Sequence, residues 1–189
     1  MIFTTKILDG LDGLATGIIT IGSLVIFFLS STQRFYQPDV ALISLILAGA
    51  CIGFLIFNFH PAKIYLGEGG GLFLGFILGT LAIISGSKIA TTLLVMALPI
   101  LDLLLVIYKR KKSGHPVFIG DRRHLHFRLV DIGFGYKASV FFLYIVAFLF
   151  GITTLILPSL YKMMVLGLLI ILFFILELKL GRIEKTKKV

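Results

Sequence analysis

The chain has 189 residues, of which 58% are hydrophobic and only 14% are charged, and its mean hydropathy is +1.08. A soluble domain carries about a quarter charged residues, so this composition excludes an ordinary soluble domain and indicates a membrane protein. The net charge of +9 would suit nucleic acid, but basic loops in a membrane protein more often set its topology, so we expect no nucleic acid partner.

Apolar segments close to the roughly 20 residues needed to cross a bilayer recur along the chain. We therefore predict an all-α fold, a polytopic membrane helix bundle of about six spans that forms a single membrane domain over 1–189. The predicted spans are 14–31, 40–57, 71–86, 89–108, 138–157 and 161–179. The first apolar run is not a secretory signal, because acids precede it and no small-residue cleavage site follows it.

The loops between these spans differ in charge. Six spans place both termini on one side, together with the loops 1–13, 58–70 and 109–137 and the tail 180–189. With Lys179 counted as part of the tail, this side holds 15 of the 18 lysines and arginines. By the positive-inside rule, this side and both termini are expected to be cytoplasmic.

Two acids stand in the first loop, "KILDGLDGLATG". In a helical turn, the i, i+3 spacing of Asp9 and Asp12 puts both carboxylates on one face, where they repel unless a cation or donors lie between them. Gly10 and Gly13 leave room for a ligand to approach the backbone. A solvated turn whose acids are favoured by the helix dipole is the alternative.

The second polar segment is "NFHPAKIYLGEGGG", residues 58–71. A glycine-rich turn at a helix N-terminus can present N–H groups to phosphate, and Glu68 could bind a hard cation such as Mg²⁺. A flexible reversal with a solvated Glu68 is equally consistent. Further on, Gly71, Gly75 and Gly79 form a small-residue face that predicts helix packing.

The third polar segment is "GHPVFIGDRRHLHFRL", residues 114–129. Arginine and histidine suit phosphate groups, whereas a loop that only sets topology needs no histidines. The His-x-His pair has no third zinc ligand at a familiar spacing. Two acids lie inside predicted spans: we expect Asp102 to face the bundle and meet a basic group or backbone donors, and Glu177 to reach the interface.

These motifs resemble the C-terminal half of the polyprenyl-phosphate N-acetylhexosamine-1-phosphate transferases, glycosyltransferase family 4. "DGLDGLATG" matches the family's D-G-L-D-G-L-A-x-G, and "NFHPAKIYLGEGGGLFLGF" is similar to its N-F-x-P-A-K-x-F-x-G-D-x-G-S-x-F-L-G. "PILDLLLVIYKR" and "DRRHLHFRLVDIG" resemble its P-x-x-D and D-R-x-H-x-H-x-x-L segments. The loops favour the N-acetylglucosamine branch, because the muramoyl-pentapeptide branch typically carries a triple histidine.

The resemblance implies a reaction at a bacterial-type cytoplasmic (inner) membrane, with the active face cytoplasmic. A polyprenyl (undecaprenyl) phosphate attacks the sugar-side phosphorus of a UDP-N-acetylhexosamine and releases UMP, with Mg²⁺, or Mn²⁺ in its place, as cofactor. This is the first membrane step of cell-wall, polysaccharide or O-antigen biosynthesis. The resemblance implies catalytic roles for Asp9, Asp12, His124 and His126, substrate binding by Lys6, Tyr65, Asp121, Arg122 and Arg123, and metal binding by Glu68.

Some positions depart from the family pattern. Lys6 stands where asparagine is usual, and Glu68 replaces an aspartate and is one methylene longer. The matched motifs begin next to Met1, so we expect the family's N-terminal half, with its own aspartate pair, to be absent from this chain, which has six spans instead of ten or eleven. A homodimer, or a second chain that supplies that half, is therefore an expected partner besides the membrane lipid.

Two other functions are open from the sequence. The chain could be a truncated or degenerate relative that binds nucleotide sugar or lipid phosphate without turnover, because this reading shares every motif with the enzyme. It could also be a small transporter, with Asp102 as an intramembrane ion site. The polar groups crowd one face and leave the middle of the bundle nearly bare, which argues against a transporter.

Overall fold

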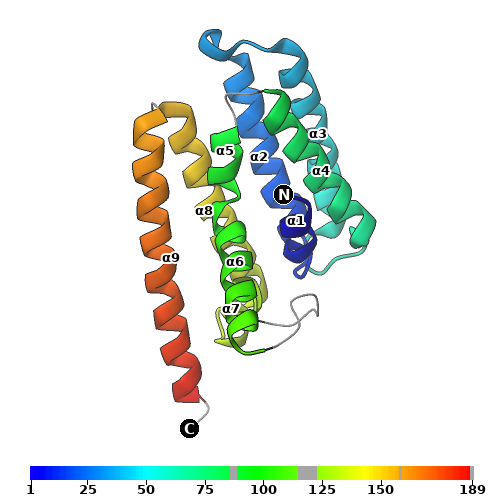
Figure 1. Cartoon of the computed structure of the whole chain (residues 1–189). Coiled ribbons are helices and arrows are strands. Elements are labelled where there is room, and N and C mark those ends of the chain that lie inside the picture. Colours follow the sequence, from blue (N-terminus) through cyan, green and yellow to red (C-terminus); the bar gives the residue numbers. More distant parts are fainter. Residues whose placement is uncertain (86–88, 115–122, 158, 188–189) are drawn as a thin grey trace.

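The computed structural model describes residues 1–85, 89–114, 123–157 and 159–187, and the described part is helical without any strand (Figure 1). The elements are α1 (Ile2–Leu8), α2 (Leu14–Ser31), the 3-10 turn η1 (Gln33–Phe35), α3 (Pro38–Asn58), α4 (Gly67–Ile84), α5 (Ile89–Val95), α6 (Ala97–Lys112), α7 (Leu125–Asp131), α8 (Tyr136–Ile156) and α9 (Ser159–Lys187). The predicted all-α class is confirmed.

Among the described residues, five helices are long and apolar enough to cross a membrane: α2, α3, α4, α8 and the part of α9 from Tyr161 to Gly181. The predicted span 89–108 is divided in the structure into α5 and α6, which are separated at Met96 and bent by 70°, and it counts as a sixth span only as a broken one. Pro99 lies in the first turn of α6, where its missing N–H costs nothing. Further into a helix, its ring would clash with the carbonyl of Val95, so the break falls between these two residues.

Helix α2 lies at the centre of the bundle and packs most extensively against α3 and α8. Leu14, Ile18, Ile19 and Ile26 on this helix are almost completely buried. The outward faces of α3, α4, α8 and α9 keep many large apolar side chains exposed, as expected for a surface that meets lipid. The protein is therefore a multi-pass membrane protein.

The glycine face of α4 packs against α1, which confirms the predicted helix packing. A Cβ on Gly75 would lie 2.7 Å from Thr5 Oγ1 and 2.9 Å from Ile2 Cα, so only glycine fits at this crossing. Gly71 and Gly79 also face α1, at Lys6 and Met1. The expected loop 1–13 thus starts with a helix that is inserted beside α4, and Met1 lies at mid-height of the bundle (Figure 1).

Helix α9 runs along one side of the bundle (Figure 1). The prediction that Glu177 reaches the interface is wrong, because its side chain is only 6% exposed and two basic residues pair with it. Arg128 Nη1 donates to its two carboxylate oxygens at 2.6 and 2.7 Å, and Lys109 Nζ donates to Oε2 at 2.7 Å. This cluster ties α6 and α7 to α9.

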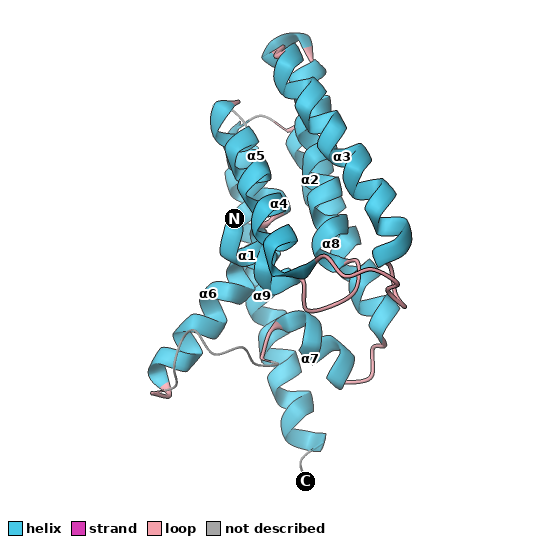
Figure 2. Ribbon diagram, turned by 90° about the vertical axis from the view of Figure 1, so that its right-hand side faces the viewer, coloured by secondary structure: helices cyan, strands magenta, loops and turns pink. Residues whose placement is uncertain are grey.

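The segments that carry the polar motifs lie at one end of the bundle. The α1–α2 loop, the α3–α4 loop and α7 are grouped there, whereas the α2–α3 connection lies at the opposite end (Figures 1 and 2). The alternation of the spans predicted this grouping.

Candidate active site

Asp12 is held by the loop that follows α3. Its Oδ2 is 2.9 Å from His60 Nδ1 and accepts a hydrogen bond from the Ala62 N–H at 3.2 Å. The His60 ring stacks on Tyr136 at a centroid distance of 4.0 Å, and the Tyr136 hydroxyl accepts a hydrogen bond from the Asp12 N–H. His60 and Tyr136 were not singled out from the sequence. The only available signal was a histidine inside the predicted motif loop.

The backbone after Asp12 is fixed as well. Asn58, at the end of α3, is buried, and its Oδ1 accepts hydrogen bonds from the Gly13 N–H and the Thr16 hydroxyl, both at 3.1 Å. Tyr144 donates its hydroxyl proton to the Gly13 carbonyl at 2.5 Å. Because Gly13 has a φ of +79°, it takes a left-handed conformation that favours glycine at this turn. The loop therefore has one defined shape before any ligand binds.

Asp9 differs from Asp12 in having no hydrogen bond to its carboxylate within the part of the chain that the structure describes. Burial, followed by the charge of Asp12, raises the pKa of Asp9 from 3.8 to about 6. A carboxylate in this position is stabilised by a cation or by a hydrogen-bond donor from a ligand. Asp9 is therefore the acid of this loop whose carboxylate is most available to a ligand.

The protein's own side chains occupy the space where a Cβ on Gly10 or Gly13 would stand, although Gly10 itself stays exposed. A Cβ on Gly10 would lie 2.6 Å from the Phe127 ring and 2.8 Å from His126 Nε2. A Cβ on Gly13 would lie 3.1 Å from the Phe59 ring. Gly10 allows α7 to pack directly on the aspartate loop.

His126 is buried, and its Nε2 has no hydrogen-bond partner among the described residues. Burial, with a smaller effect of the nearby His124, lowers the pKa of His126 from 6.5 to about 3, so its ring is neutral at physiological pH. Its ring is parallel to that of His124, with centroids 5.8 Å apart. The structure thus places a neutral imidazole against Gly10, next to Asp9.

His124 precedes α7 and contacts a buried acid on α6. Its Nδ1 is 2.9 Å from Asp102 Oδ2, and the Leu125 N–H donates to Asp102 Oδ1, also at 2.9 Å. The expectation that Asp102 faces the bundle and meets a basic group or backbone donors is confirmed.

Glu68 and Lys6 form an ion pair across the α1–α4 contact, and both side chains are largely exposed. Tyr65 lies nearby in the sequence and is 74% exposed. Arg123 is exposed next to His124, whereas Asp121 and Arg122 lie outside the described residues. The structure therefore brings Lys6 to Glu68, His60 to Asp12, and His126 to the Asp9–Asp12 loop.

A divalent cation fits some of the predicted residues better than others. In the described ranges, no three histidine, cysteine or acidic side chains converge as a ready metal centre. The Asp9–Asp12 pair suits a hard cation, since a half-buried acid with a raised pKa gains from a positive charge. Glu68 suits it less, because Lys6 already neutralises its carboxylate.

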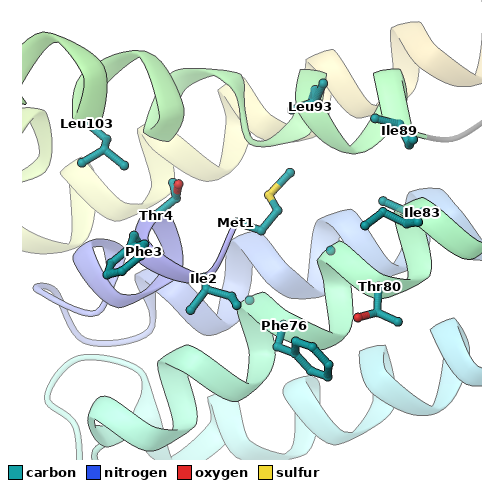
Figure 3. A pocket seen from close by; sticks show the side chains of 13 residues that line it. Met1, Ile2, Phe3, Thr4, Phe76, Thr80, Ile83, Ile89, Leu93 and Leu103 are labelled. Atoms are coloured by element: carbon teal, nitrogen blue, oxygen red, sulfur yellow. The ribbon is translucent and has the colours of Figure 1, made fainter.

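An apolar groove of about 620 Å³ lies apart from these polar groups. Residues of α1, α4, α5 and α6 line it, and Figure 3 shows Met1, Ile83 and Leu93 around the opening. None of the predicted site residues that the structure describes lines this groove. The candidate active site is therefore the polar end of the bundle.

Known proteins share the sequence that builds this end. The family model described as glycosyl transferase family 4 matches residues 2–86, which include the aspartate loop and the Glu68 turn. A probable undecaprenyl-phosphate N-acetylglucosaminyl 1-phosphate transferase of Bacillus subtilis is 32% identical over 160 residues, which cover 82% of this chain and 44% of that protein. The chain belongs to glycosyl transferase family 4.

Other relatives of this family 4 protein include both N-acetylglucosamine-phosphate transferases and phospho-N-acetylmuramoyl-pentapeptide transferases. The decaprenyl-phosphate N-acetylglucosaminephosphotransferase of Mycobacterium tuberculosis is 37% identical over 72% of this chain and 40% of its own length. A phospho-N-acetylmuramoyl-pentapeptide-transferase of Moorella thermoacetica is 37% identical over 64% of this chain and 38% of its own length. The family 4 chain thus spans less than half the length of these relatives.

Proposed function

We propose that this chain takes part in the transfer of N-acetylhexosamine 1-phosphate from a UDP-sugar to a polyprenyl phosphate, with release of UMP, as a step of cell-wall or polysaccharide synthesis. The similarity to transferases named for this reaction supports the proposal. The observation that carries it in the structure is the packing of the His124–His126 segment on the Asp9–Asp12 loop, with His60 bound to Asp12.

The proposed chemistry is phosphoryl transfer between two anions, in which positioning and charge neutralisation contribute most. An oxygen of the lipid phosphate forms a bond to the sugar-side phosphorus, and the bond from that phosphorus to the bridging oxygen of UMP breaks. Asp9 and Asp12 would hold Mg²⁺, which neutralises charge on the diphosphate when it is bound. His124 and the neighbouring Arg123 would face phosphate oxygens, and Tyr65 would stack on the uracil.

The topology follows from the same proposal. The Asp9–Asp12 loop, the Glu68 turn and the basic ends of α6 and α7 would face the cytoplasm, where UDP-sugars are made available. The basic last turn of α6, Lys109 to Lys112, supports this orientation. Attachment of a membrane-impermeant label to an introduced cysteine, with Cys51 replaced, would report the side on which this turn lies.

The function is tested by UMP release from the purified protein with Mg²⁺, UDP-N-acetylglucosamine and undecaprenyl phosphate. The assay is run with this chain alone, and with the chain co-expressed with the part of the Bacillus subtilis relative that the match leaves out. Release in either arm supports the proposal, and release only in the second shows that a further chain is needed. If UDP-sugar binds but no UMP is released in either arm, the proposal of catalytic turnover is wrong and only a binding function is left.

A further inference from the structure

Asp102 is a buried acid that the proposed chemistry does not use. It lies on α6, after the bend at Met96, and its side chain is 7% exposed. A buried carboxylate is costly unless donors satisfy its oxygens, and here each oxygen has one: His124 Nδ1 on Oδ2 and the Leu125 N–H on Oδ1, both at 2.9 Å. The carboxylate thus joins α6 to the first residues of α7 through two bonds of defined direction.

These two bonds fix the orientation of the His124 ring. The Leu125 N–H belongs to the first turn of α7, where backbone donors have no partner within the helix, so Asp102 caps this helix from another element. A carboxylate can only accept hydrogen bonds, so the proton must reside on Nδ1 of His124. Nε2 is then the nitrogen directed away from Asp102.

We propose that Asp102 is a positioning residue that sets the tautomer and the orientation of His124, so that Nε2 is presented to a phosphate group of the substrate. This inference rests on the proposed function for the identity of the substrate. When His124 takes up a proton, Nε2–H donates to a phosphate oxygen while Asp102 partners the positive ring. The ring of His126 is parallel to that of His124, and its Nε2 also has no hydrogen-bond partner among the described residues.

The tautomer is measured directly by nitrogen NMR of the histidine-labelled protein in detergent. The His124 signals are assigned by their loss in His124→Gln. We expect the proton on Nδ1 in the wild type. In Asp102→Asn, an amide N–H faces Nδ1, so the proton should move to Nε2. A wild-type His124 protonated on Nε2 would overturn the inference, even if the Asn variant does not fold.

Glu177→Gln is the matched control, because it weakens the attachment of α7 to α9 without touching the Asp102–His124 pair. Its His124 tautomer should stay as in the wild type. A changed tautomer in this variant would show that packing of α7, and not Asp102, sets the ring state. The comparison separates positioning from general structural support.

Activity supplies the second readout. Asp102→Asn should lower kcat by about 10- to 100-fold, the usual effect of removing the partner that orients a histidine, and leave UDP-sugar affinity within about threefold. Asp102→Glu, which keeps a carboxylate, should recover part of this loss. An unchanged kcat in the Asn variant would contradict the inference. If the proposed function is wrong, the wild type releases no UMP, whereas the NMR test of the tautomer can still be carried out. The two failures are therefore distinguishable.

Discussion

Tyr144 covers Gly17 so closely that a Cβ on Gly17 would lie 2.1 Å from both Cζ and the hydroxyl oxygen of the tyrosine. The same hydroxyl donates to the Gly13 carbonyl at 2.5 Å. A glycine in the first turn of α2 therefore allows a residue of α8 to reach the backbone of the aspartate loop. The packing of two membrane helices and the shape of the candidate site depend on the same contact.

We predict that Gly17→Ala lowers the free energy of unfolding by about 1–3 kcal/mol, because the methyl group must displace Tyr144. The melting temperature in detergent measures this effect. Gly49→Ala on α3 is the control, since nothing lies within 4 Å of the added Cβ there. The double variant with Tyr144→Ala should lose less than the sum of the two single losses. Strict additivity would show that the two residues do not interact.

The two aspartates should respond differently to substitution. Asp9→Asn should reduce UMP release at least tenfold with little change in melting temperature, because the Asp9 carboxylate has no hydrogen bond among the described residues. Asp12→Asn should also cost about 1–3 kcal/mol of stability, because it disturbs the bonds from His60 and the Ala62 N–H. A larger loss of folded protein for Asp9→Asn than for Asp12→Asn would assign the structural role to Asp9.

Acid should destabilise the protein through His126. Its pKa is about 3 in the folded protein and 6.5 ordinarily, so the unfolded chain binds a proton that the folded chain does not. The stability from this group is present above pH 6.5 and is lost as the pH falls toward 3; by pH 5 the loss is about 2 kcal/mol.

The measurement is the melting temperature against pH for the wild type and for His126→Gln, which cannot titrate. The variant should have the flatter curve between pH 7 and 5. Asp9 acts in the opposite direction, since its raised pKa makes the folded state bind protons as the pH falls through about 6. Parallel curves for the two proteins would show that His126 does not contribute.

Lys6 should compete with metal for Glu68. Replacing it by asparagine, the residue usual in the resembling family, should change the unfolding free energy by less than about 1 kcal/mol, because the pair is exposed. The Mg²⁺ concentration needed for half-maximal UMP release should fall, since Glu68 is then unpaired. Lys63→Asn removes a lysine from the neighbouring loop and should leave both values unchanged. An unaltered Mg²⁺ requirement in Lys6→Asn would exclude Glu68 from the cation site.

The helices were largely predictable from the sequence, because runs of apolar residues near the thickness of a bilayer leave few alternatives. The size of the bend at Met96 could not be predicted, because Pro99 is compatible with either a kinked or a broken span. The grouping of the motif loops at one end followed from the alternation of the spans.

The side-chain partners were less predictable, because they depend on contacts between residues far apart in the sequence. Asp102 was expected to find donors, and it did, but the sequence could not show that one donor would be His124. The sequence could not show that His126 and Phe127 fill the space where a Cβ on Gly10 would stand. Glu177 looked like an interfacial acid until its distant partner, Arg128, was known.

The buried cluster of Glu177, Arg128 and Lys109 has a practical consequence for handling this protein. Removing the last helix at any point before Glu177 would take away the buried acid that Lys109 and Arg128 share, and Arg128 lies on α7 beside the histidines. Shortened versions made for crystallisation would therefore be damaged at the polar end of the bundle, far along the chain from the cut. A purification tag should be added after the final residue, with α9 kept in place.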